Sequence, residues 1–341
     1  MAKIEYSFED ICRDIVNKNF APVYVLMGEE PYFIDKIEEL LVKNVLTDTE
    51  RDFNQMIFYG SDSDAVSIIN SARRFPMMSK RQLVIIKEAQ SLNKIELLSH
   101  YVKKPAPTTV FVICHKYKKL DGRKSLLMEA KKVGIVFDSK KIYDNKMPGF
   151  IISFLKQRTM DIDGKSAQML SDYLGNDISR LEKETEKLAV ILENNPLKRI
   201  TPEIIEKNIG ISKDYNNFEF VNAIASKDIL RANRIADYFN KNQKLNPAVM
   251  VLPVLFNYFV NLMICFYSKD KSERGIMQTL NLQWSFQATD YMLGLRNYKA
   301  VKAFEIIHEI RLADAKFKGF GATSSTSAGD IYKEMLYKII H

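Results

Sequence analysis

Gly28 opens a stretch whose residue types can be compared, one by one, with those that bind nucleotide phosphates. A phosphate-binding loop of the form G-x-x-x-x-G-K-[ST] needs a second glycine, a lysine for the β- and γ-phosphates and a hydroxyl for Mg²⁺. Counted from Gly28, these three positions hold Phe33, Ile34 and Asp35. Pro31 removes one backbone donor, and Glu29 and Glu30 add negative charge beside the phosphates. The stretch therefore predicts a degenerate nucleotide site that does not bind ATP.

Lys87 is a second defect for the same chemistry. In a nucleotide-binding parallel sheet, an aspartate at the end of the third strand holds Mg²⁺. The third expected strand here, residues 82–86, runs instead into Lys87, and a cation cannot bind Mg²⁺. An ordinary strand-to-helix turn without any relation to nucleotide-binding proteins remains an alternative for residues 22–36.

Other catalytic and metal-binding patterns are missing from the sequence. The four histidines, His100, His115, His308 and His341, are scattered, and no H-E-x-x-H or G-x-S-x-G pattern is present. Cys12, Cys114 and Cys265 form no C-x-x-C pair, which disfavours disulfides and a zinc site and fits a reducing cytoplasm. We expect no catalytic residue, no metal and no cofactor.

Residues 75–81, Phe-Pro-Met-Met-Ser-Lys-Arg, carry chemistry suited to binding a protein. Pro76 ends the preceding helix, and Met77 and Met78 follow in a short connection before a buried strand. Methionine is flexible and polarisable, so it suits an anchor that inserts into a partner's pocket. The alternative, in which both methionines fold back into the core, stays open.

A basic segment follows the fourth expected strand. Its cations include Lys118, Lys119, Arg123 and Lys124. These residues predict contact with DNA phosphates, and a solvated charged turn is the open alternative. The net charge of +8 and the pI of about 9.1 are compatible with nucleic acid or with an acidic protein partner.

Short apolar runs that alternate with helical segments must position these residues. The expected strands are 23–27, 56–59, 82–86, 109–114 and 134–137. Helical segments separate them, beginning at Pro31, which suits a first helical turn. In the helical segment 62–75, Val66, Ile69 and Ala72 are expected to face inward. The alternation predicts a parallel α/β sheet.

The pattern becomes helical after about residue 140. Segments 151–159, 165–174 and 178–192, followed by a helix that begins at Thr201-Pro202, predict a small all-helical domain. Longer helices follow at 226–240, 247–267, 286–296, 298–316 and 330–340. Residues 249–267 are nearly all apolar, but Pro253, Asn257 and Asn261 form one non-apolar stripe, which favours a buried helix over a membrane span. The first six residues lack the apolar stretch of a signal peptide.

In their order and spacing, five segments resemble the delta subunit of the bacterial DNA polymerase III clamp loader, a member of the AAA+ family. These segments are residues 22–32, 75–89, 119–124, 175–184 and 313–319. The resemblance implies an AAA+-like clamp-binding domain without a functional phosphate loop (1–140), a helical lid domain (141–212) and a helical collar for oligomerisation (213–341). It also implies that Phe75, Met77, Met78 and Arg81 bind the sliding clamp. The family often has a leucine–phenylalanine pair where this chain has Met77 and Met78, so apolar bulk is kept and an aromatic ring is lost.

The resemblance further implies a subunit that opens the ring-shaped sliding clamp for loading onto primed DNA during chromosomal replication, without binding ATP itself. Its implied partners are the sliding clamp (beta subunit), the gamma/tau and delta-prime subunits of a hetero-pentamer, and primed DNA. We expect a cytoplasmic, nucleoid-associated protein without a membrane, and no catalysis by this chain alone, although the DNA-directed DNA polymerase III holoenzyme is a nucleotidyltransferase. A delta-prime-like subunit is the alternative, but its cysteine cluster and Ser-Arg-Cys finger are missing. An active AAA+ replication ATPase is opposed by Ile34, Asp35 and Lys87.

Overall fold

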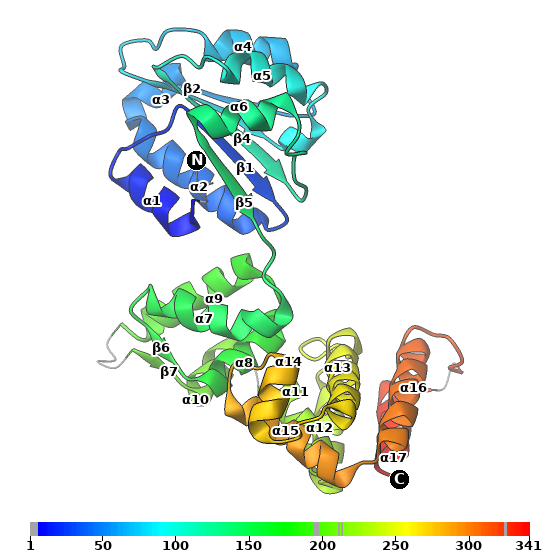
Figure 1. The fold of residues 1–341 in the computed structure, drawn as a ribbon. Coiled ribbons are helices and arrows are strands. Elements are labelled where there is room, and N and C mark those ends of the chain that lie inside the picture. The colour runs from blue at the N-terminus through cyan, green and yellow to red at the C-terminus, as the bar shows by residue number, and fades with distance from the viewer. Residues whose placement is uncertain (1–5, 194–197, 211, 213, 324–325) are drawn as a thin grey trace. The chain divides into compact units, whose positions relative to one another are not determined.

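The computed structural model describes residues 6–193, 198–210, 212, 214–323 and 326–341. The chain divides into two compact units, Met1–Ile142 and Tyr143–His341 (Figure 1). Each unit is described by itself. Residues 1–5, where a signal peptide was not expected, lie outside the described residues.

A five-stranded parallel sheet forms the centre of the first unit. Its strands lie in the order β2-β3-β4-β1-β5, and every neighbouring pair is parallel. The strands are β1 (Val23–Gly28), β2 (Gln55–Tyr59), β3 (Gln82–Lys87), β4 (Thr109–Lys116) and β5 (Ile135–Ser139). Each predicted strand is present within two residues at either end, so the predicted parallel α/β architecture is confirmed.

Helices cover both faces of this sheet, which explains why its strands are continuous apolar runs (Figure 1). On one face, α1 and α2 pack against residues such as Tyr24, Leu26 and Ile85. On the other face, α4, α5 and α6 pack against Val25, Val84 and others. The helices are α1 (Phe8–Val16), α2 (Pro31–Val45), α3 (Asp48–Asn54), α4 (Ala65–Ala72), α5 (Ser99–Val102) and α6 (Ser125–Val133), with 3-10 turns η1 (Ala89–Ser91) and η2 (Ile95–Leu98).

The predicted inward position of Val66 is wrong. The helix begins at Ala65 because the Asp64 carboxylate accepts hydrogen bonds from the backbone N–H groups of Val66 and Ser67. Val66 is therefore in the first turn, and it is exposed. The buried face instead contains Ile68 together with the predicted Ile69 and Ala72.

The second unit is mainly helical. Its elements are η3 (Asp144–Lys146), α7 (Met147–Lys156), β6 (Asp161–Ile162), α8 (Gly164–Leu174), α9 (Ile178–Ile191), β7 (Arg199–Ile200), α10 (Pro202–Ile209), α11 (Asn217–Ala225), α12 (Ile229–Lys241), α13 (Ala248–Tyr267), α14 (Glu273–Leu280), α15 (Ser285–Asn297), α16 (Ala300–Phe317) and α17 (Ala328–Ile340). The parallel pair β6–β7 contradicts the predicted all-helical domain. Two residues per strand are too few for an alternating pattern to be recognised in the sequence.

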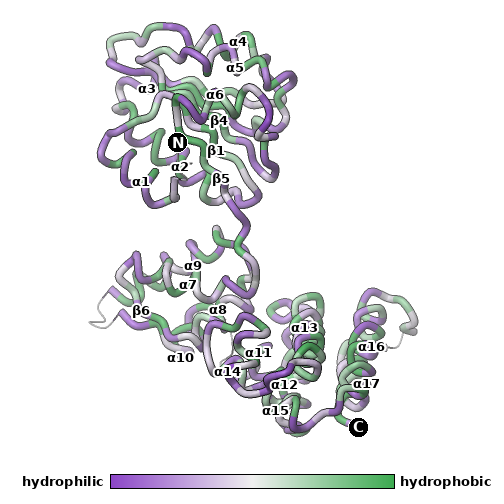
Figure 2. The backbone as a smooth tube through the Cα atoms, in the orientation of Figure 1, coloured by the Kyte–Doolittle hydropathy of each residue, from purple (hydrophilic) through white to green (hydrophobic). Residues whose placement is uncertain are grey.

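The apolar helix α13 is a core helix of the second unit. By length and composition alone it could cross a membrane. Its buried residues, however, include Leu255, Phe259 and Leu262, and they belong to one core cluster with residues of α11, α12, α16 and α17. Figure 2 shows the apolar residues along this helix and along the strands of the first unit. Of its most apolar 18-residue stretch 39% is buried, so one side of the helix packs in the core while residues such as Val249 and Tyr267 stay exposed.

Candidate functional site

The turn between β1 and α2 is closed against β5. Gly28 has a φ of +138°, and a Cβ built on it would lie 2.1 Å from the carbonyl oxygen of Ser139. No side chain fits at this distance, so the close approach of the two strand ends requires glycine. Gly28 therefore allows the ends of β1 and β5 to pack closely together.

Backbone donors that could cradle a phosphate are used inside the protein. The N–H groups of Glu29 and Glu30 donate to the Ser139 carbonyl oxygen at 2.8 and 3.3 Å. The Ser139 hydroxyl in turn donates to the carbonyl oxygen of Glu30 at 2.6 Å. The Glu30 carboxylate accepts from the backbone N–H of Tyr32 at 3.1 Å, where α2 begins at Pro31. A negatively charged side chain thus occupies the helix N-terminus that a phosphate would need.

The three positions that replace the motif residues have structural roles. Ile34 is fully buried in the core between α2 and the sheet. The ring of Phe33 packs edge-on against Phe8, with 4.9 Å between the ring centroids. Asp35 lies at hydrogen-bonding distance, 2.7 Å, from the Nζ atom of Lys116 on β4. None of these side chains supplies a donor for a triphosphate.

Ion pairs occupy the ends of β3 and β4, where a Mg²⁺ ion would bind in a nucleotide-binding sheet. Lys87 Nζ lies 2.8 Å from the carboxylate of the buried Glu38, and Lys116 Nζ lies 3.2 Å from Glu88. Burial disfavours the charged form of Lys116, but hydrogen bonds and Coulombic attraction from Asp35 and Glu88 outweigh it and raise its pKa. Lys87 shows the same balance, with Glu38 raising its pKa against the effect of burial. Both cations therefore stay charged and paired.

The segment between α4 and β3 exposes its apolar side chains. Phe75 is 86% exposed, Met77 is 62% exposed and Met78 is 104% exposed. The alternative in which both methionines enter the core is therefore excluded. Met78 also has a φ of +52°, a left-handed conformation that is uncommon for a residue with an unbranched side chain. We call Phe75, Met77 and Met78 the methionine tip.

Asn54 holds the methionine tip in place. Its side-chain oxygen accepts from the backbone N–H of Met77 at 2.6 Å, and its Nδ2 donates to the Met77 carbonyl oxygen at 2.9 Å. Asn54 is only 1% exposed. Asn54 could not be found from the sequence, because 23 positions separate it from Met77 and no motif links the two residues.

Further contacts fix both ends of the tip. The buried Gln82 amide donates to the carbonyl oxygen of Arg74 at 2.7 Å, immediately before Phe75. At the other end, the Ser79 hydroxyl donates to the Arg81 carbonyl oxygen at 3.0 Å. The Arg81 guanidinium lies over the ring of Phe20, 5.1 Å from its centroid. The tip is therefore displayed on a supported backbone.

The basic segment carries its own counter-charges. Lys119 pairs with Asp138 at 2.8 Å. Arg123 pairs with Asp121 at 3.2 Å, and Lys124 pairs with Glu96 at 3.4 Å. Lys118 is exposed and has no ion pair within the described part of the chain. These pairs are surface pairs and exchange readily with other anions.

The predicted site residues lie at two opposite edges of the sheet. The methionine tip precedes the first residue of β3, and Asn54 precedes the first residue of β2. Gly28 and Lys87 are the last residues of β1 and β3, and the basic segment follows the last residue of β4. Because all five strands are parallel, the first group lies at the amino edge and the second at the carboxyl edge. The two groups are therefore separate sites.

Comparisons with known proteins agree with one another. Residues 24–140 match the family model described as DNA polymerase III, delta subunit. The DNA polymerase III subunit delta of Bacillus subtilis (strain 168) is 24% identical over 260 residues, which cover 73% of this chain and 74% of that protein. The probable DNA polymerase III subunit delta of Aquifex aeolicus (strain VF5) is 22% identical over 231 residues, with 63% of each protein covered.

A solved structure shares the fold. The Bacillus subtilis DNA clamp loader delta protein aligns with a TM-score of 0.60 and 21% identity, covering 98% of this chain and 99% of that one. The resemblance stated from the sequence is confirmed by the family model, the relatives and this structure.

Proposed function

We propose, on the premise that this chain is a delta subunit of a bacterial DNA polymerase III clamp loader, that it binds and opens the ring-shaped sliding clamp without binding ATP. The observation that carries the proposal is the methionine tip, whose apolar side chains are exposed while Asn54 holds their backbone. An anchor that is already ordered before binding loses little conformational entropy on association. Phe75 and Arg81 flank the two methionines as further clamp contacts.

The association with a clamp and with other loader subunits follows from the same premise. We propose that residues 1–140 bind the clamp, that residues 141–212 form a lid domain, and that residues 213–341 form a collar that joins gamma/tau and delta-prime subunits in a hetero-pentamer. The chain then acts in the cytoplasm near the nucleoid, on primed DNA. Catalysis belongs to its partner subunits.

The isolated chain is expected not to bind Mg-ATP in titration calorimetry. The Ser139 carbonyl already accepts the backbone donors of the β1–α2 turn, and Lys87 and Lys116 are paired with Glu38 and Asp35. Triphosphate binding would have to break these contacts and place anions beside Glu30. A sister loader subunit with an intact phosphate loop serves as the positive control. A micromolar dissociation constant for this chain would contradict the proposal that the β1–α2 turn does not bind a triphosphate.

The basic segment is expected to contact DNA phosphates in the assembled loader. Replacing Lys118, Lys119, Arg123 and Lys124 with alanine should weaken binding of primed DNA and leave clamp binding unchanged. Each lost phosphate contact lowers the slope of log K against log[salt] by roughly 0.7–0.9. The measurement is fluorescence anisotropy of labelled primed DNA between low and moderate salt. An unchanged slope would mean that the segment is a solvated turn neutralised by Asp121, Asp138 and Glu96.

A further inference from the structure

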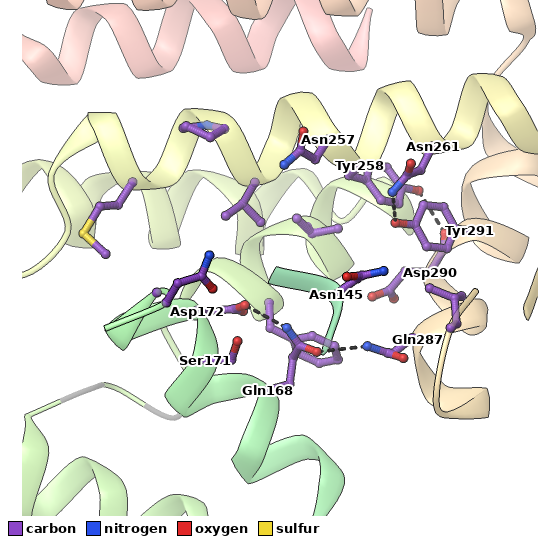
Figure 3. A pocket seen from close by; sticks show the side chains of 18 of the residues that line it. Asn145, Gln168, Ser171, Asp172, Asn257, Tyr258, Asn261, Gln287, Asp290 and Tyr291 are labelled. Carbon is purple, nitrogen blue, oxygen red and sulfur yellow. Dashed lines mark hydrogen bonds between the residues drawn. The ribbon is translucent and has the colours of Figure 1, made fainter. Parts of the chain in front are cut away.

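A cavity of about 470 Å³ lies within the second unit, among α8, α11, α13 and α15 (Figure 3). This volume falls within the range of roughly 300–1,000 Å³ that is usual for small-molecule sites. Its polar lining comes from carboxylate, amide and hydroxyl side chains, among them Gln168, Ser171, Asp172, Gln287 and Asp290. The stripe Pro253, Asn257 and Asn261 on α13, which the proposed function leaves unexplained, lies on its wall.

We infer that this cavity binds a small aliphatic ammonium compound, with Asp172 as its counter-charge. Two carboxylates and no lysine, arginine or histidine are among the described residues that line it. A phosphate or carboxylate ligand would therefore meet no cation in the lining, whereas an ammonium group would meet carboxylates of the opposite charge. The inference is independent of the proposed clamp function.

Asp290 is already compensated by its surroundings. Its Oδ1 accepts a hydrogen bond from Asn222 at 2.7 Å. Lys165 and Arg231 act on it electrostatically, and both of these cations pair with Glu219. Glu219, Lys165 and Arg231 together therefore carry one net positive charge near Asp290. Asp290 therefore already has positive charge near it and does not need that of a ligand.

Asp172 is the carboxylate without a cation. Its Oδ1 accepts from Gln168 Nε2 at 2.8 Å, and no ion pair to it exists within the described residues. The Oε1 atom of Gln168 accepts from Gln287 at 2.9 Å, which orients the amide toward Asp172 (Figure 3). Burial raises the pKa of Asp172 to about 7, and only the hydrogen bond from Gln168 acts against it. Burial raises the pKa of Asp290 as well, but there Arg231 and Lys165 also act against it.

Ser171, beside Asp172 on α8, adds a hydroxyl group to the same lining. The residue is only 7% exposed, and its hydroxyl makes no hydrogen bond within the described part of the chain. Figure 3 shows the Ser171 oxygen and the Asp172 carboxylate on the same wall of the cavity. An ammonium group, with three N–H donors, could satisfy both residues.

The remaining lining suits a methylene chain. Phe218, Val221 and Val254 supply apolar surface, and the rings of Tyr258 and Tyr291 stack with 5.2 Å between centroids. Asn261 donates to the Tyr291 hydroxyl at 3.1 Å and holds that ring at the edge of the site. A divalent metal ion is a poorer ligand, because no group of three His, Cys, Asp or Glu residues in the described chain could hold one.

Titration calorimetry of the full chain with 1,4-diaminobutane tests the inference, with 1,4-butanediol as a neutral ligand of similar shape. We expect one diamine to bind per chain and the diol not to bind. Asp172→Asn keeps the shape and an acceptor for Gln168 but removes the charge, so it should weaken diamine binding at least tenfold. Asp237→Asn, which changes an exposed carboxylate on α12 paired with Lys241, is the matched control and should leave binding unchanged.

A second variant tests the same inference by gain of binding. Asn257 is exposed at the mouth of the cavity, so Asn257→Asp adds a carboxylate without disturbing the core and should tighten diamine binding severalfold. Circular dichroism verifies that each variant is folded. Equal affinities of the original chain and Asp172→Asn, no gain with Asn257→Asp, or equal binding of the diol would each overturn the inference.

Discussion

Replacing Met77 and Met78 with alanine is expected to abolish detectable binding of the sliding clamp while leaving the melting temperature unchanged. Truncating one central anchor of an interface typically costs about 2–4 kcal/mol, which is on the order of 30- to 1000-fold in affinity. Both side chains are exposed in the free protein, so their loss removes no packing and should change folding stability by less than about 0.5 kcal/mol. Clamp binding is measured by surface plasmon resonance and stability by calorimetry.

Met128→Ala provides the matched control, because Met128 is also an exposed methionine but lies on α6. It should bind the clamp as the original chain does. If the methionine tip were part of the core, each truncation would instead lower stability by about 2–5 kcal/mol. A sharp fall in melting temperature, with residual binding explained by the folded fraction, would refute the role of the tip.

Asn54→Ala tests how much the supported backbone of the methionine tip, apart from its side chains, contributes to clamp binding. This variant keeps both methionines but removes the two hydrogen bonds that hold the Met77 backbone. We expect weaker clamp binding than in the original chain, yet stronger binding than in the double methionine variant. Because Asn54 is buried, this variant should also lose stability, by about 1–3 kcal/mol for the groups left unpaired.

Charging the exposed face of α16 is expected to prevent entry into the clamp-loader complex. Val301 and Phe304 are 72% and 67% exposed and lie three residues apart, on one side of the helix. The opposite side, with Ala303, Ile306 and Ile310, packs into the core of the second unit. The double variant Val301→Asp/Phe304→Asp should therefore fold normally but place two carboxylates in an apolar interface, which is strongly unfavourable.

Size-exclusion chromatography of the reconstituted loader measures this effect. Val190→Asp is the matched control, because Val190 is a similarly exposed apolar residue on α9, in the proposed lid. The α16 variant should elute as free subunit, and the control should elute with the complex. Normal assembly of the α16 variant would move the collar contact to another face.

The strands and the start of α2 could be predicted because their signals are local. Val23 to Met27 form a continuous apolar run that only a doubly covered strand explains, and Pro31 fits one position in a helix. Met77 and Met78 could be singled out because Pro76 cannot continue a helix, although α4 already ends at Ala72. Even here the sequence left core and surface open, because methionine is usually buried but also serves as an exposed anchor at binding surfaces.

Long-range pairing could not be predicted. Lys116 and Asp35 come from different elements, and nothing in the sequence near either residue identifies the other. The same applies to the hydrogen bonds of Asn54 with Met77 and of Ser139 with Glu29. The helix α14 was missed as well, since it has only eight residues and contains Gly275. Such contacts depend on how the chain folds back on itself.

The ion pairs beside the β1–α2 turn also limit how this chain could evolve. Restoring an aspartate at position 87 by itself would remove the partner of Glu38 and set two carboxylates against each other in a buried place. Replacing Asp35 alone with a hydroxyl residue would deprive Lys116 of one of its counter-ions. Each such single change is therefore expected to lower stability, and on the proposal that this chain does not bind ATP, neither change alone supplies all the groups that a nucleotide site needs. Proteins that descend from this chain are therefore expected to keep the Lys87–Glu38 and Lys116–Asp35 ion pairs, while the residues around these pairs change.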